Sequence, residues 1–207
     1  MTAVPVATKT RILDAAEKLF GQNGFDATSL RDITAEAQVN LAAVNYHFQS
    51  KESLIDAVIV RRLEPVNRRR MEMLDAAGSA PSLEQIIEAF IAPVVLEADM
   101  QNAAPLIGRV LSNPAQFAVR IFQKQLAPVA RRFDEAIAAA VPGIPAEERF
   151  WRLHFMAGAM THLLALWDVL PMMTLLPIEP IHRPALVQRM VRFLAAGFRA
   201  PLAEERN

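Results

Sequence analysis

Apolar residues recur at helical spacing along almost the whole chain, and no segment shows the apolar–polar alternation of a half-buried strand. The first segment carries one such apolar stripe, formed by Ile12, Ala15, Ala16, Leu19 and Phe20. Gly24 follows it as a stop, and the glycine- and proline-rich segments 78–81 and 142–145 are further breaks. The pattern predicts an all-helical protein of about nine helices.

The breaks also predict how these helices are distributed. Short helices are expected in the first 50 residues, followed by a long helix from Lys51 into the seventies with Pro65 inside it. Later helices are expected at about 82–100, 104–111, 115–140, 146–170 and 184–198. The chain should therefore form a small N-terminal unit and a larger C-terminal helical core.

Composition restricts the class of protein. With 207 residues, 53% of them apolar, the chain can bury a large core. It contains no cysteine, which excludes disulfides and thiolate metal sites. The N-terminus does not have the pattern of a signal peptide, and no uncharged apolar run reaches the roughly 18 residues of a membrane span. We expect a cytoplasmic protein without a membrane segment.

Charge leaves nucleic-acid binding open. The net charge is zero, and the first 60 residues contain five Lys or Arg against seven Asp or Glu. Any basic face must therefore come from local arrangement, with help from Arg61, Arg62 and the run Arg68 to Arg70. Such a run is more often a solvated helix face than a phosphate-binding surface.

Two short helices joined by a tight turn are expected at about residues 29–48. Asn40 is a good cap for the second helix, and Ser50 for the long helix that follows. The second helix presents small and polar side chains outward, while Val44 and Phe48 point into the core. This arrangement predicts a helix-turn-helix whose second helix enters a DNA major groove.

The outward side chains suggest particular DNA contacts. Asn45 can pair with a base edge, adenine being the best match, and Ala42 can contact a thymine methyl group. Candidates for phosphate contacts are Tyr46, His47 and Lys51, together with Thr28 and Ser29 at the start of the first helix of the pair.

The same residues carry a family resemblance. The segments ILDAAEKLFGQNGF, TSLRDITAEAQV, NYHF and SKESL resemble the TetR family of bacterial transcriptional regulators. The resemblance implies a homodimer through the last two helices, a DNA-binding domain at 8–68 and a ligand-binding and dimerisation domain at 82–200. It assigns DNA contacts to Thr28, Ser29, Asn40, Ala42, Ala43, Asn45, Tyr46, His47 and Lys51, although capping is the expected main role of Asn40.

One residue departs from the family pattern. The turn between the two helices commonly carries glycine, but Gln38 stands there. A left-handed conformation at Gln38 would cost on the order of 1 kcal/mol relative to glycine.

The expected helix at 146–170 is apolar nearly all round, which predicts burial on several sides. A dimer seam and a ligand cavity are both available explanations. Small residues at 157–159 and 195–197 would allow close helix approach in a seam across a two-fold axis.

Polar and soft side chains of the C-terminal core are the candidates for ligand binding: Arg109, Arg120, His154, Met156, Met160, His162 and Trp167. Methionine is nevertheless more often plain core filler. His154 and His162 lie eight residues apart without a carboxylate cluster, so neither a metal site nor a cofactor is predicted. The segments at 108–114, 125–128 and 149–159 resemble the TetR subgroup that senses fatty acids, which implies an apolar tunnel with an arginine or histidine near the head group.

The sequence leaves two function classes open, a DNA-binding regulator and a protein–protein interaction module. No phosphate-binding loop, nucleophile elbow or zinc-protease motif supports an enzyme. A helical protein–protein interaction module would explain the apolar helices but not the small, polar face of the second short helix. We therefore expect a repressor that binds a palindromic operator and is released by a small apolar effector. A fatty acid and an acyl-CoA are candidates for that effector.

Overall fold

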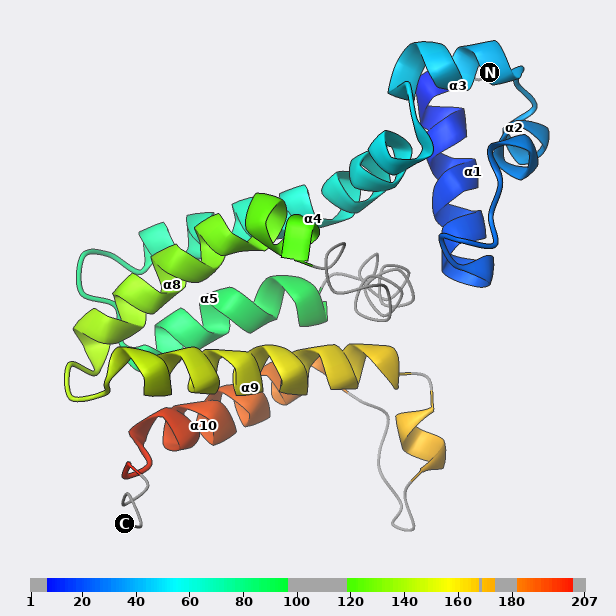
Figure 1. Ribbon diagram of the computed structural model, residues 1–207. Coiled ribbons are helices and arrows are strands. Elements are labelled where there is room, and N and C mark those ends of the chain that lie inside the picture. The colour runs from blue at the N-terminus through cyan, green and yellow to red at the C-terminus, as the bar shows by residue number, and fades with distance from the viewer. Residues whose placement is uncertain (1–6, 97–118, 168, 174–181, 203–207) are drawn as a thin grey trace, which may run out of the picture. The chain divides into compact units, whose positions relative to one another are not determined.

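A computed structural model describes residues 7–96, 119–167, 169–173 and 182–202 (Figure 1). Every regular element in these ranges is helical, and eight of them are α-helices, so the predicted all-helical fold is confirmed. The helix expected at 104–111 lies outside the described residues. Within the described ranges, no helix is long and apolar enough to cross a membrane. The chain divides into two compact units between Glu64 and Pro65.

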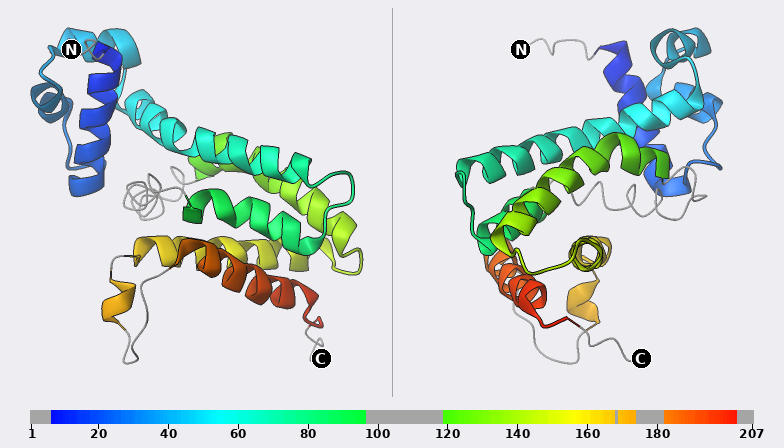
Figure 2. Two further views of the ribbon diagram at one scale, coloured as in Figure 1. Left: turned by 180° about the vertical axis from the view of Figure 1, so that it is seen from behind. Right: turned by 60° about the vertical axis from the view of Figure 1, so that its left-hand side comes forward.

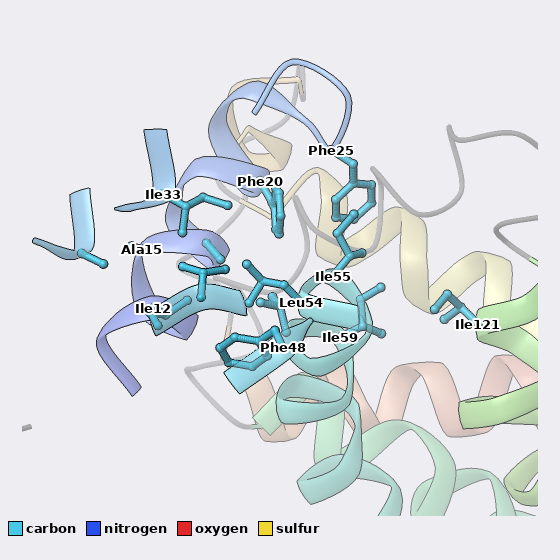
Figure 3. Packing of buried hydrophobic residues seen from close by; sticks show 14 residues of the cluster. Ile12, Ala15, Phe20, Phe25, Ile33, Phe48, Leu54, Ile55, Ile59 and Ile121 are labelled. Carbon is cyan, nitrogen blue, oxygen red and sulfur yellow. The ribbon is translucent and has the colours of Figure 1, made fainter. Parts of the chain in front are cut away.

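The N-terminal unit consists of residues 7–64 and 119–122. It contains α1 (Thr8–Asn23), α2 (Leu30–Ala37), α3 (Leu41–Phe48) and the first half of α4 (Lys51–Ala76). The first three helices pack against one another in every pairing. They enclose one apolar core (Figure 3), whose largest buried side chains include Ile12, Phe20, Phe25, Ile33, Phe48 and Leu54.

Short-range interactions set the helix ends of this unit. Gly24 ends α1 with a φ of 87°, which glycine adopts without steric cost. The side-chain oxygens of Ser29, Asn40 and Ser50 each accept the N–H three residues further on, at 3.2, 2.9 and 3.1 Å. The predicted caps at Asn40 and Ser50 are confirmed, and Ser29 rather than Thr28 caps α2.

The C-terminal unit contains the second half of α4, from Pro65, together with α5 (Leu83–Leu96), α8 (Ala127–Ala140), α9 (Ala146–Ala165) and α10 (Arg183–Arg199). In this unit α5 and α9 both pack against α8 and against α10, so the four helices close a ring (Figure 2). Buried arginine hydrogen bonds reinforce it: Arg152 on α9 donates to the carbonyls of Phe198 and Ala200 at 2.6 and 3.0 Å. These carbonyls lie at the end of α10, where they lack helical partners.

Prolines account for two departures from the expected helices. The segment expected as one helix to Ala140 contains a π-helical turn at Phe122–Leu126, just before Pro128. A proline ring clashes with the carbonyl four residues earlier in an α-helix, and a wider turn relieves that clash. The helix expected to reach Leu170 ends at Ala165 and is followed by a 3₁₀ turn at Leu170–Met172. Pro171 excludes α-helical continuation through the turn before it.

Candidate nucleic-acid interface

Helix α3 separates its side chains between the core and the surface. Val44 and Phe48 are buried, as predicted. Ala42, Asn45 and Tyr46 are exposed on the other side, and the Tyr46 side chain is 83% exposed. The exposed face therefore offers a methyl group, a carboxamide and a phenol on one short helix. This is the set of groups that can reach base edges and phosphates in a major groove.

The turn before α3 has a left-handed backbone at Gln38, a conformation that costs more for glutamine than for glycine. Gln38 has φ 53° and ψ 49°, in the left-handed region. Arg11 on α1 compensates, because its Nη2 donates to the carbonyls of Ala37 at 2.5 Å and Gln38 at 2.7 Å. These carbonyls end α2 and have no helical partner of their own. Arg11 thus holds the turn between α2 and α3, a role that we did not predict from the sequence.

Thr28 does not belong to the exposed face, which corrects the sequence-based expectation. Its side chain is fully buried, and its Oγ1 donates to the carbonyls of Gly24 at 2.8 Å and Leu19 at 3.3 Å. The hydroxyl therefore satisfies the C-terminal carbonyls of α1 and cannot turn toward a ligand. The neighbouring Ser29 is exposed, but its hydroxyl is shared with Asp32 in a capping box.

Local hydrogen bonds also set the electrostatics at the starts of these helices. The hydroxyl and backbone N–H of Ser29 donate to Asp32, and these bonds lower the pKa of Asp32. At the start of α4, the backbone N–H of Glu52 and the Ser50 hydroxyl lower the pKa of Glu52. Both carboxylates are thus stabilised as anions at helix N-termini, as the helix dipole favours.

The remaining predicted DNA-binding residues lie around α3, and Ala43, His47 and Lys51 among them are half-buried. Asn40 uses its side-chain oxygen as the α3 cap, and Ala43 is half-buried against the core. His47 is half-buried, with its ring edge-on to Tyr46 at 5.0 Å. Lys51 Nζ lies 3.4 Å from the carbonyl of Asp26. The structure therefore gathers these side chains around α3, with Ala42, Asn45 and Tyr46 on its exposed face.

The arginines expected to add a basic face are largely occupied. Arg61 pairs with Asp14 at 2.6 Å and with Glu17, and Arg62 pairs with Glu17. Partial burial lowers the pKa of Arg61, but the hydrogen bonds that it donates to Glu17 and Asp14 raise the pKa by more, so it lies above the usual value. These pairs tie α4 to α1. Their charge is neutralised within the unit and contributes little to phosphate binding.

The described ligand-binding candidates on α9 differ in burial. Met156 and Met160 are buried in the C-terminal unit, whereas His154 and His162 on the same helix are exposed. The helical repeat explains this, because residues 152, 156, 160 and 164 form the buried stripe of α9. Arg120 belongs to the N-terminal unit and pairs with Asp56 at 3.0 Å. Trp167 lies under the guanidinium of Arg183, 5.2 Å from its ring centroid, and Arg109 lies outside the described residues.

The C-terminal unit contains a buried cation, Arg70, that we did not predict from the sequence. Arg70 is only 4% exposed, although it ends an arginine run expected to be solvated, and Arg68 and Arg69 are indeed exposed. A signal was present, because Arg70 is spaced four residues from both Val66 and Leu74, which are buried.

Comparison with known proteins identifies the family. The model of the bacterial regulatory proteins of the tetR family matches residues 12–58. The model of the tetracyclin repressor-like C-terminal domain matches residues 88–197, more than half of the chain. The chain belongs to the TetR family. Its N-terminal unit is thus a helix-turn-helix DNA-binding unit, and the protein is a transcriptional regulator rather than an enzyme.

Individual proteins are also similar to this chain. The HTH-type transcriptional regulator UidR of Escherichia coli K12 is 37% identical over 68 residues, 33% of this chain and 35% of UidR. The chain covers less than half of the length of the curated relatives it matches. Among solved structures, Salmonella enterica GusR superimposes with a TM-score of 0.67 at 19% identity, over 97% of this chain and 99% of GusR. Bacillus subtilis FadR, solved with stearoyl-CoA, gives 0.66 at 14% identity, over 91% and 98%.

Proposed function

We propose that this TetR-family regulator is a cytoplasmic repressor that binds a palindromic operator as a homodimer and is released by a small apolar effector. The exposed face of α3 carries the DNA-binding part of the proposal. Asn45 would read a base edge, Ala42 would contact a thymine methyl, and Tyr46 would donate to a phosphate. Ser29, Asn40, Ala43, His47 and Lys51 would position the helix on the duplex.

Exposed aromatic side chains support dimerisation through α9 and α10. Phe150, Trp151 and Phe155 are exposed on α9, and Phe193 is 75% exposed on α10. An apolar surface of this kind on a folded unit is typical of a protein interface. Gly158 on α9 and Gly197 on α10 are open as well, since a Cβ at either would meet no atom within 4 Å. Two copies could bring these helices close together across a two-fold axis.

The C-terminal unit is proposed to hold the effector. Its buried side chains are almost all apolar and include Met156 and Met160 on one stripe of α9. Such a lining suits an apolar molecule, and methionine adapts readily to an irregular ligand shape. The bound stearoyl-CoA named for FadR makes a fatty acid or acyl-CoA a reasonable effector class to test here.

Release from DNA is proposed to pass through α4. This helix contributes to both units, and Pro65 stands where they divide. Effector binding would change the course of α4 and with it the separation of the two recognition helices in the dimer. Because half-sites lie about one helical turn apart or a multiple of it, a changed separation prevents both helices from docking together.

A gel-shift experiment with a palindromic fragment from the upstream region of the gene tests the proposal. The purified dimer should prefer this fragment to random DNA, with a dependence on salt set by few phosphate contacts. Asn45→Ala should relax sequence preference by about 1–3 kcal/mol, while Lys51→Ala should weaken binding to all sequences alike. A dimer without any sequence preference would instead favour the alternative, a helical protein–protein interaction module.

A further inference from the structure

Arg70 places a full positive charge inside the C-terminal unit. Its guanidinium extends from α4 toward α5 and α9, where Nε donates to the Phe90 carbonyl at 2.8 Å and Nη2 lies 3.5 Å from the Met160 sulfur. Nη1 donates to Asn67 Oδ1 at 3.3 Å. The Phe90 ring lies against the guanidinium, 4.1 Å from ring centroid to Cζ. Arg70 is thus held by two helices besides its own.

Two neighbours are arranged to hold Arg70 in this position. Asn67 donates its Nδ2 to the Gln125 carbonyl at 2.8 Å, which turns Oδ1 toward Arg70. Pro93 lacks an N–H, so the turn of α5 that contains Phe90 lacks the helical hydrogen bond to the Ala89 carbonyl. The guanidinium is therefore positioned by specific contacts rather than placed in the core by chance.

None of these contacts neutralises the charge. Within the described part of the chain, no carboxylate lies within 4 Å of the Arg70 guanidinium. Its acceptors are a carbonyl, a carboxamide and a thioether, and a thioether accepts only weakly. Among the described residues, three of the five N–H groups have such partners, which leaves hydrogen-bonding capacity for an anion.

The charge itself persists at neutral pH. Burial lowers the pKa of Arg70 to about 10, which still leaves the guanidinium protonated at pH 7. A buried charge without a counter-charge strongly disfavours the folded state. An anion bound beside it would remove that penalty and would gain charge-assisted hydrogen bonds.

We propose that Arg70 is the counter-ion for a carboxylate of the effector, so that the effector is an organic acid rather than a neutral apolar molecule. The inference rests on the proposed function and specifies its ligand. A carboxylate matches the planar fork of a guanidinium and is small enough for a site almost closed to solvent. The apolar surroundings of Phe90 and Met160 suit the hydrocarbon next to the carboxylate. An acyl-CoA thioester carries no carboxylate at its acyl end and would not satisfy Arg70 in this way.

Thermal shift of the full-length protein, shown to be free of bound acids by native mass spectrometry, tests the assignment. The probes are straight-chain carboxylates from butanoate to hexadecanoate, each with its matching primary alcohol, and dodecanoyl-CoA. At least one acid should bind wild type roughly 10- to 100-fold more tightly than its alcohol. Arg70→Met should abolish that preference, whereas Arg68→Met, an exposed arginine of the same helix, should keep it.

The stability of the ligand-free protein provides the second measurement. Without ligand, Arg70→Met should be at least as stable as wild type, because it removes a buried charge that no carboxylate of the described residues pairs with. If Arg70→Met does not fold, Arg70→Gln, which is neutral but keeps an amide donor, takes its place. The proposal is overturned if no acid exceeds its alcohol, if dodecanoyl-CoA alone shows the Arg70 dependence, or if the preference survives in the variant.

Operator binding separates this inference from the proposed function. Wild type and Arg68→Met, an exposed arginine outside the proposed site, should both bind the operator fragment without ligand. Retained operator binding without any acid preference overturns the role of Arg70 alone. Absence of operator binding in wild type overturns the proposed function instead.

Discussion

Replacing Arg11 by methionine should loosen the helix-turn-helix without disturbing its apolar core. The variant loses two hydrogen bonds from a charged donor, one part-buried to the Ala37 carbonyl and one exposed to the Gln38 carbonyl. A bond from a charged group contributes about 1.5–3 kcal/mol, but water replaces most of the exposed one. Gln38 has a left-handed backbone that these bonds help to hold, so the free energy of unfolding of the N-terminal unit should fall by about 2 kcal/mol. If DNA binding must restore the turn, operator affinity falls by up to about 30-fold.

Lys18→Met is the matched control for this experiment. Lys18 also joins α1 to α2, through Glu36 at 2.6 Å, but their side chains are 54% and 39% exposed. Such a surface ion pair contributes about 0–1 kcal/mol. Urea denaturation, operator titration and hydrogen exchange of residues 30–48 should all distinguish the two variants. If Arg11→Met costs no more than Lys18→Met and leaves exchange in this segment unchanged, the reasoning about the turn is wrong.

Three further predictions follow from the same structure. Thr28→Val keeps the shape but removes a buried donor, so it should destabilise the protein by about 1–3 kcal/mol in urea denaturation, while Thr28→Ser should cost less. Gly158→Leu should raise the dissociation constant of the dimer at least about tenfold in analytical ultracentrifugation without destabilising the monomer. The control Gly21→Leu, which also lies in a helix, should remain dimeric. If both variants remain dimeric, α9 is excluded from the interface. The hydrogen bond from Arg199 lowers the pKa of Glu84 below 4.5, so its stabilisation is present above that pH and is lost as pH falls through the lowered value. Glu84→Gln should therefore be less stable than wild type at neutral pH but equally stable in strong acid, and an equal gap at both would contradict this.

Much of the N-terminal unit could be predicted from its sequence, because the signals are short-range. A helical stripe depends on residues three or four positions apart, and a cap depends on an oxygen three residues from the N–H it accepts. The positions of Asn40, Ser50, Val44 and Phe48 followed from these rules. The division of α3 into a buried and an exposed face followed as well.

The predictions that failed depend on how separate segments of the chain pack together. Thr28 is a residue type that often caps helices at the surface, yet packing directs its hydroxyl to the end of α1. Arg61 and Arg62 were expected to add positive charge, but folding brings them to Glu17, more than 40 residues away. Short-range patterns do not specify such pairs, since they depend on how helices pack.

The helical class and the capped helices of the helix-turn-helix were therefore determined by the sequence alone, through periodicity and capping. Only the tertiary structure decided which charged side chains remain available. It neutralises the arginines near the DNA-binding unit, assigns Arg11 to the turn and buries Arg70 between α5 and α9. The physical reason is that burial and charge pairing are set by contacts between helices, which the pattern along any one helix does not encode.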